Sequence, residues 1–168
     1  MEVLRIAAFS DGGAGGGPAG VAIGGALPQA EEMQRIAAEV GFSETAFAAA
    51  EGDRWRVRYF SPESEVPFCG HATIALGAAL ALRRGDGLYR LSLNAAEITV
   101  EARRDGDGLT ASLQSPPTRS RPADPDVLES ALALLGLSHG DLDLRIPPAI
   151  AEGGATHLVL ALGDRQTL

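Results

Sequence analysis

The residue types best able to carry chemistry stand together in Cys69-Gly70-His71, at the start of a long apolar segment. If a helix begins here, the free N–H groups of its first turn can bind an anion or a developing oxyanion. Gly70 lets a ligand approach the backbone, and the helix dipole disfavours positive charge on His71. We therefore expect His71 to act as a neutral donor or acceptor beside a carboxylate substrate.

Cys69 has two interpretations at this position. Side chains two residues apart at a helix start do not face each other, so we expect no nucleophilic pair between Cys69 and His71. A thiol at a helix N-terminus can have a lowered pKa and serve as a proton-transfer base. A small buried apolar residue is the simpler interpretation.

A carboxylate with a similar ambiguity is Glu44, in Ser43-Glu44-Thr45. Its apolar neighbours Phe42 and Phe47 can half-bury it, as a proton-shuttling acid/base requires. A lone Glu in a turn is more commonly just solvated. The sequence at this level leaves both interpretations open.

The elements that must position these side chains follow from periodicity and turn residues. One helix, at 71–84, is apolar almost all the way round and must be surrounded by protein. Before this helix, the predicted order is a strand at 3–9, a glycine-rich turn at 11–20, a strand at 21–23, a helix at 29–40 and a hairpin of 45–50 and 54–61. After it come strands at 89–93, 98–103 and 109–113, the last two joined by a turn at 105–108. A helix from 125, capped by Asp124, and a strand at 157–162 complete the order.

This order predicts an α+β lobe, in which a curved, mostly antiparallel sheet wraps around the buried helix. We assign residues 1–115 to an N-terminal lobe that carries Glu44 and His71. Residues 116–124, with three Pro, are predicted to be a linker. Residues 125–168 resemble the beginning of a second lobe, because so few elements cannot bury their own apolar faces.

Composition excludes several function classes. All fourteen basic residues of the 168-residue chain are Arg, so Schiff-base and Walker-type lysines are excluded. A formal charge of −8 argues against nucleic acid or an anionic membrane as partner. With one Cys and three scattered His we expect no metal site, and the chain start predicts a cytoplasmic protein. Gly15-x-Gly17-x-x-Gly20 fits a dinucleotide pattern, but its strand-like continuation favours a turn.

Five ordered blocks together resemble the PhzF-like (phenazine-biosynthesis) family of isomerases. The match is dense over residues 1 to about 115 and weak around 154–162. The blocks are Gly-Gly-Pro-Ala-Gly-Val (16–21), Met-Gln-x-Ile-Ala-x-Glu (33–39), Phe-Ser-Glu-Thr-Ala-Phe (42–47), Arg-Val-Arg-Tyr-Phe-Ser-Pro (56–62) and Glu-Val-Pro-Phe-Cys-Gly-His-Ala-Thr (65–73).

The resemblance implies a diaminopimelate-epimerase-like fold of two lobes with a cleft between them. It also implies a cofactor-independent isomerase that moves a proton in a small carboxylic acid, either dihydro-hydroxyanthranilate-like or amino-acid-like. Carried over to this sequence, Glu44 is the acid/base and His71 assists. The residues implied to bind substrate are Gly17, Pro18, Ser43, Gly70, Ala72 and Thr73.

Two departures from the family pattern stand out. The family usually has Gly-Asn-Pro where this chain has Gly16-Gly17-Pro18, so a side-chain amide is lost. The second lobe's substrate motifs do not follow either, so we expect a truncated second lobe. The expected partner is a second copy or the missing C-terminal lobe. Two alternatives stay open: a catalytically silent lobe that only associates, and an epimerase that uses Cys69 as its base.

Overall fold

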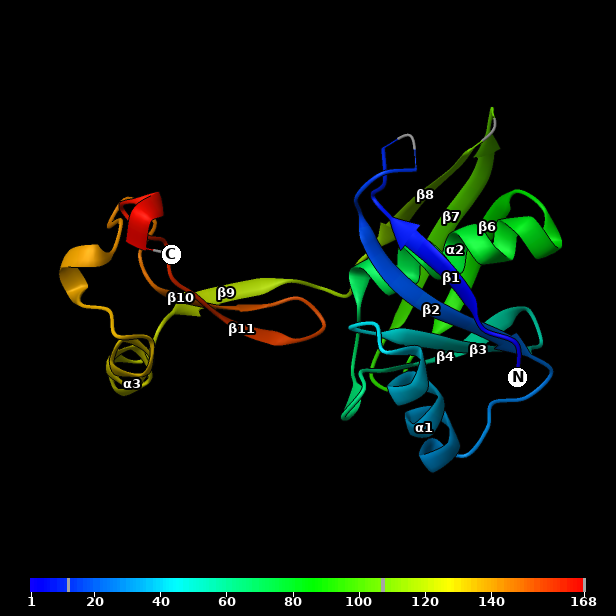
Figure 1. Ribbon diagram of the computed structural model, residues 1–168, viewed down its shortest axis with the longest axis horizontal. Coiled ribbons are helices and arrows are strands. Elements are labelled where there is room, and N and C mark those ends of the chain that lie inside the picture. The colour runs from blue at the N-terminus through cyan, green and yellow to red at the C-terminus, as the bar shows by residue number, and fades with distance from the viewer. Residues whose placement is uncertain (12, 107, 168) are drawn as a thin grey trace. The chain divides into compact units, whose positions relative to one another are not determined.

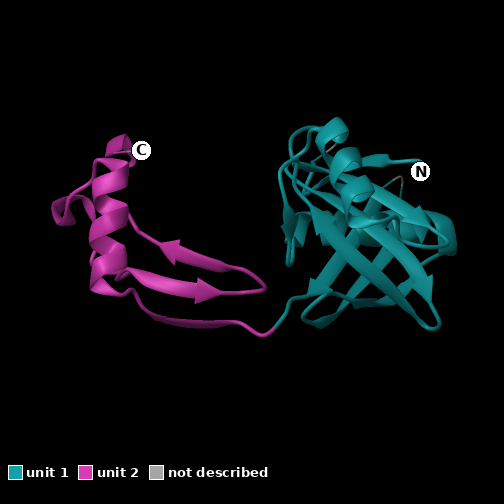
Figure 2. Ribbon diagram, turned by 90° about the horizontal axis from the view of Figure 1, so that it is seen from below, with its two compact units in different colours: residues 1–116 teal, residues 117–168 magenta. Residues whose placement is uncertain are grey.

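The computed structural model describes residues 1–11, 13–106 and 108–167, which divide into two compact units. Unit 1 is Met1–Pro116 and unit 2 is Pro117–Leu168 (Figure 2). Gly12 of the predicted glycine-rich turn, Asp107 of the predicted turn at 105–108 and Leu168 of the predicted second lobe lie outside the described residues. No described helix is long and apolar enough to cross a membrane.

Unit 1 is built on a mixed sheet with the strand order β1-β2-β3-β4-β6-β7-β8, and β5 pairs with β4. Neighbouring strands are antiparallel except β2 with β3 and β4 with β6, which are parallel. Its strands are β1 (Leu4–Ala8), β2 (Gly17–Gly24), β3 (Thr45–Glu51), β4 (Arg54–Phe60), β5 (Glu65–Val66), β6 (Gly87–Ser92), β7 (Glu97–Asp105) and β8 (Gly108–Gln114).

The sheet curves around helix α2 (Gly70–Arg84), which confirms the predicted α+β architecture (Figure 1). The inward side chains Trp55, Val57 and Tyr59 of β4 pack in the same core as the helix. Gly77 lies so close to β7 that an added Cβ would stand 2.5 Å from Val100 Cγ2. The helix that carries His71 is therefore fixed by close packing along its length.

Helix α1 (Ala30–Val40) packs in a separate cluster with side chains from β3 and β4. Met33 and Ile36 meet Phe47 and Phe60 there, and the two aromatic rings cross edge to face at 5.7 Å. Gly41 ends α1 in the left-handed conformation, with φ 73°. The short segment between α1 and β3, which contains Glu44, is thus held at both ends.

Unit 2 contains a three-stranded sheet and helix α3 (Pro125–Leu135). Its strands are β9 (Arg119–Pro122), β10 (Ala149–Glu152) and β11 (Thr156–Val159), in the order β11-β10-β9. The predicted cap of α3 is confirmed, since the Asp124 carboxylate accepts the Asp126 N–H at 3.1 Å. Leu132 is buried, whereas Leu134 is 87% exposed.

The structure corrects two predicted elements. Strand β2 begins at Gly17 rather than at Val21, because backbone pairing with β1 needs no side chain, and even Pro18 stands opposite Ala7. Part of the segment predicted to be a linker forms β9, whose four residues are exposed and show no apolar alternation. Strand β10, which pairs with β9, was not predicted.

Candidate active site

Three chemically competent side chains converge at the N-terminus of α2. Glu44 lies directly before β3, Cys69 precedes the helix, and His71 is in its first turn. One ligand atom from each of these residues lies within 4.8 Å of the others. The backbone fixes the Glu44 segment, because Gly20 N–H donates to Glu44 O at 3.1 Å. Residues from two distant parts of the sequence thus form one cluster.

The His71 ring stands between the other two groups. Its Nε2 lies 3.4 Å from Glu44 Oε2 and 3.4 Å from Ser43 Oγ. Its Nδ1 lies 3.2 Å from Cys69 Sγ. A neutral imidazole donates from one nitrogen and accepts at the other, so the ring can connect thiol and carboxylate.

The prediction that Cys69 and His71 do not face each other is wrong. That prediction applied helical spacing to both residues, but Cys69 is the N-cap and has extended backbone angles, φ −143° and ψ 116°. An extended residue directs its side chain differently from a helical one, here across the first turn toward the ring.

The Cys69 thiol does not have the lowered pKa that its place at a helix N-terminus suggested. Burial, with 8% of the residue exposed, raises the pKa of the thiol to about 11. The negative charge of Glu44 raises it further, whereas the N–H groups of Ala72 and His71 act in the opposite direction. Cys69 is therefore a protonated thiol at neutral pH.

A buried hydrogen-bond chain anchors the helix start to β4. Thr73 Oγ1 donates to Cys69 O at 2.7 Å and lies 2.7 Å from the Tyr59 hydroxyl. Thr73 N–H also donates to Cys69 O, at 3.0 Å. Burial raises the pKa of Tyr59 far above its usual range, so this hydroxyl remains a donor. Sequence reasoning missed Tyr59, although a Tyr on the inward face of a strand needs a polar partner.

These contacts correct the predicted role of Thr73. Its side chain is fully buried and its N–H already bonds to Cys69 O, so it has no amide to offer a substrate. Ala72 is also fully buried. The position of a Cβ on Gly70 has no atom within 4 Å, so space is open beside the first residue of the helix.

The other predicted binding residues lie on β2 and in the turn before β3. A Cβ on Gly17 would stand 3.5 Å from His71 Cδ2, so the backbone of β2 flanks the ring. Pro18, the next residue of β2, is exposed. The Ser43 hydroxyl reaches the ring directly. Gly17 and Ser43 therefore lie beside His71.

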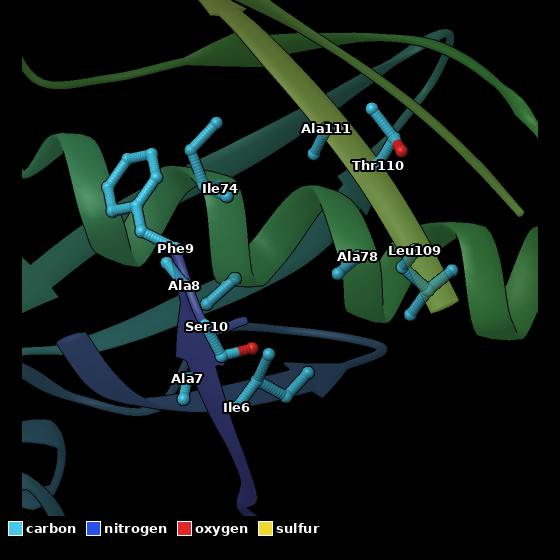
Figure 3. A pocket seen from close by; sticks show the side chains of 11 residues that line it. Ile6, Ala7, Ala8, Phe9, Ser10, Ile74, Ala78, Leu109, Thr110 and Ala111 are labelled. Atoms are coloured by element: carbon cyan, nitrogen blue, oxygen red, sulfur yellow. The ribbon is translucent and has the colours of Figure 1, made fainter. Parts of the chain in front are cut away.

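A separate pocket of about 390 Å³ opens between β1 and β8, with α2 as its floor (Figure 3). Ile6, Ile74 and Leu109 contribute apolar side chains to its wall. Phe9 borders it with a left-handed backbone, φ 60°, and is 74% exposed. Glu44, Cys69 and His71 do not line this pocket, so it is distinct from the cluster.

Comparison with known proteins identifies the family of this chain. A family model described as phenazine biosynthesis-like protein (PhzC-PhzF) matches residues 6–168. An uncharacterized isomerase of Pseudomonas aeruginosa is 36% identical over 137 residues, which cover 80% of this chain and 51% of that protein. The chain thus spans about half the length of the curated relatives it matches.

Solved structures agree on the fold. A phenazine biosynthesis protein of the PhzF family from Bacillus anthracis superposes with a TM-score of 0.76 at 27% identity, over 98% of this chain and 56% of that one. A predicted epimerase from Pseudomonas aeruginosa gives a TM-score of 0.87 at 22% identity, over 99% and 60% of the two chains. The second likeness concerns the fold alone.

Proposed function

This chain belongs to the phenazine biosynthesis-like protein family, and we propose that unit 1 carries the acid/base of an isomerase. In this proposal, Glu44 moves a proton in a small carboxylic acid that is dihydro-hydroxyanthranilate-like or amino-acid-like. The reaction uses side chains alone. The observation that carries the proposal is the contact of 3.4 Å between Glu44 Oε2 and His71 Nε2 at the N-terminus of α2.

Exposure and position support the role of Glu44. Its side chain is 22% exposed and that of His71 is 23% exposed, so both are sheltered yet reachable. A partly buried carboxylate is a more effective proton acceptor than a fully hydrated one, because less solvent must be displaced. Of the three residues Glu44, Cys69 and His71, Glu44 is the one with an acceptor oxygen.

The proposed reaction is a shift of one proton. The Glu44 carboxylate takes a proton from a substrate carbon and returns it at another position of the same molecule. His71 donates its Nε2–H to the carboxylate and orients it. The positive end of α2, open beside Gly70, attracts the substrate carboxylate.

Isotope exchange tests this proposal on the complete protein. Glu44→Gln keeps the shape of the side chain but removes its basicity, so solvent deuterium should no longer enter the substrate. Glu39→Gln is the matched control, because Glu39 is an exposed carboxylate paired with Arg35 on α1. Full exchange in Glu44→Gln would exclude Glu44 as the acid/base.

A second candidate function makes Cys69 the base. The 3.2 Å contact between Cys69 Sγ and His71 Nδ1 favours it, because an imidazole next to a thiol can accept its proton. The variant Cys69→Ala distinguishes the Glu44 mechanism from the Cys69 mechanism. If solvent deuterium still enters the substrate at the same rate in this variant, Cys69 is not the base. In a third candidate the chain is silent and only associates, as a homodimer or with a further lobe, which light scattering and an exchange assay distinguish.

A further inference from the structure

The cluster offers one sulfur, one nitrogen and one oxygen donor, a combination that suits a borderline metal ion. Zn²⁺ binds thiolate at about 2.3 Å and imidazole or carboxylate at about 2.0–2.2 Å, so tetrahedral ligand atoms stand about 3.4–3.6 Å apart. Cys69 Sγ and His71 Nδ1 are 3.2 Å apart. These two atoms are thus spaced nearly as two ligands of one ion.

We propose that Cys69 Sγ, His71 Nδ1 and a carboxylate oxygen of Glu44 bind Zn²⁺, and that the bound ion inhibits the enzyme. The binding part depends on the cluster alone. The inhibition part rests on the proposed function, because it requires Glu44 to be the acid/base.

The surroundings of the ring favour Nδ1 as the ligand atom. Coordination there leaves Nε2–H free to donate to Ser43 Oγ, which lies 3.4 Å away. Metal-binding histidines commonly donate their second N–H in this way, which fixes the tautomer and the ring orientation.

Closing the site requires a side-chain rotation of Glu44. Its Oε2 now lies 3.4 Å from Nε2, the ring nitrogen that the proposed site leaves uncoordinated. The Glu44 side chain is 22% exposed and has three rotatable bonds, whereas Cys69 is buried at the helix cap. The carboxylate therefore moves, while the thiol and the ring supply the fixed part of the site.

Charge also favours a divalent ion. A thiolate and a carboxylate together neutralise Zn²⁺, and a coordinated thiol loses its proton to the metal. In the part of the chain that the structure describes, the only ion-pair partner of Glu44 is His71, so no arginine competes for the carboxylate. The thiol disfavours Mg²⁺ and Ca²⁺, which prefer oxygen ligands.

Three protein ligands leave the fourth position to water, as in an open zinc site rather than a closed structural one. The core of unit 1 is built from apolar side chains and does not depend on the ion. An ion held in this way lowers the basicity of the Glu44 carboxylate, because its positive charge favours the ionised form over the protonated one.

Cobalt(II) tests the site without any enzymatic assay, because it substitutes for zinc and is coloured. Titration of the 168-residue chain with CoCl₂ should give one ion per chain, a thiolate-to-cobalt charge-transfer band and the strong visible bands of tetrahedral Co²⁺. ZnCl₂ should displace the colour. Cys69→Ala should remove the charge-transfer band, and Glu44→Gln should weaken binding about tenfold or more.

His139→Gln is the matched control. His139 Nε2 lies 2.6 Å from Glu129 Oε1 on the surface of unit 2, so it is a His–Glu pair without a thiol. Its variant should bind cobalt as the wild type does. A spectrum that survives Cys69→Ala, or that is lost in His139→Gln, would overturn the proposal. Circular dichroism of each variant shows that the fold is retained.

The two proposals fail separately. If deuterium exchange depends on Glu44 but no thiolate–cobalt band forms, the metal site is wrong and the proposed function stands. If the band forms but exchange does not depend on Glu44, the inhibitory consequence is wrong and the metal site stands. If both hold, ZnCl₂ should suppress exchange by the complete protein, and a chelator should restore it.

Discussion

The hydrogen-bond chain that anchors α2 allows a double-mutant cycle with a worked magnitude. Because Thr73 Oγ1 donates to Cys69 O, the Tyr59 hydroxyl must donate to Thr73 Oγ1. Tyr59→Phe removes one buried hydrogen bond and should cost about 1–2 kcal/mol of unfolding free energy. Thr73→Val should cost about 2–3 kcal/mol, because it also removes the bond to Cys69 O and leaves the buried Tyr59 hydroxyl without an acceptor.

The double variant decides whether this reasoning is right. With both partners apolar, no unsatisfied hydroxyl remains, so the double variant should cost about 2 kcal/mol less than the sum of the single variants. Denaturant unfolding measures this, with the fluorescence of Trp55, the only Trp of the chain, reporting on the core of unit 1.

Tyr89 supplies the control for the cycle. Its hydroxyl donates to Gly85 O at the other end of α2, whereas the hydrogen bonds of the Thr73 side chain go to Tyr59 and Cys69. Tyr89→Phe combined with Thr73→Val should therefore be additive within about 0.5 kcal/mol. If the effects of Tyr59→Phe and Thr73→Val on the free energy of unfolding also add within about 0.5 kcal/mol, Tyr59 and Thr73 are not energetically coupled and the reasoning is refuted.

Three further predictions concern the same region. Thr45 Oγ1 is buried without a hydrogen-bond partner among the described residues. Thr45→Val should therefore raise the free energy of unfolding, measured with denaturant, by about 1 kcal/mol. A lower free energy of unfolding in the variant would contradict this. Folding raises the pKa of Cys69 to about 11. The free energy of unfolding should therefore not change with the thiol below about pH 8.5, and it should fall by up to about 1.4 kcal/mol per pH unit toward pH 10. Cys69→Ala should abolish that slope, and an unchanged slope would exclude the thiol as its cause. Gly16→Ala should lower the free energy of unfolding by about 2 kcal/mol or more, since the φ of Gly16 is 85° and a Cβ would stand 2.4 Å from Ala8 O. Gly17→Ala should lower it by less than about 0.5 kcal/mol. Equal melting temperatures of the two variants would contradict this difference.

The sequence predicts elements well where burial leaves a periodic pattern. Helix α2 is apolar all round, and the residues Trp55, Val57 and Tyr59 alternate, so both elements could be assigned from side chains alone. Strand β9 could not, because all its residues are exposed and its ladder uses only backbone groups. The early start of β2 was hidden for the same reason, since Gly and Pro carry no strand signal.

The candidate site shows a different limit. Glu44 and His71 could be singled out by residue type and by the family resemblance, but their mutual distance depends on how the sheet curves. The contact between Cys69 and His71 was missed because one extended residue at a helix cap changes the direction of a side chain. The family resemblance implied that Thr73 binds substrate, but its N–H already donates to Cys69 O.

The protonation of Cys69 bears on which residue is the base. With its pKa raised to about 11, the thiol is a donor at neutral pH, and its nearest acceptor is His71 Nδ1 at 3.2 Å. A neutral ring that accepts at Nδ1 carries its proton on Nε2, which faces Glu44 Oε2. The thiol then donates to the ring and the ring donates to the carboxylate, an arrangement that supports the proposed role of Glu44 as proton acceptor. Cys69 acts in this arrangement by fixing the tautomer of His71, which favours the carboxylate mechanism over the cysteine one.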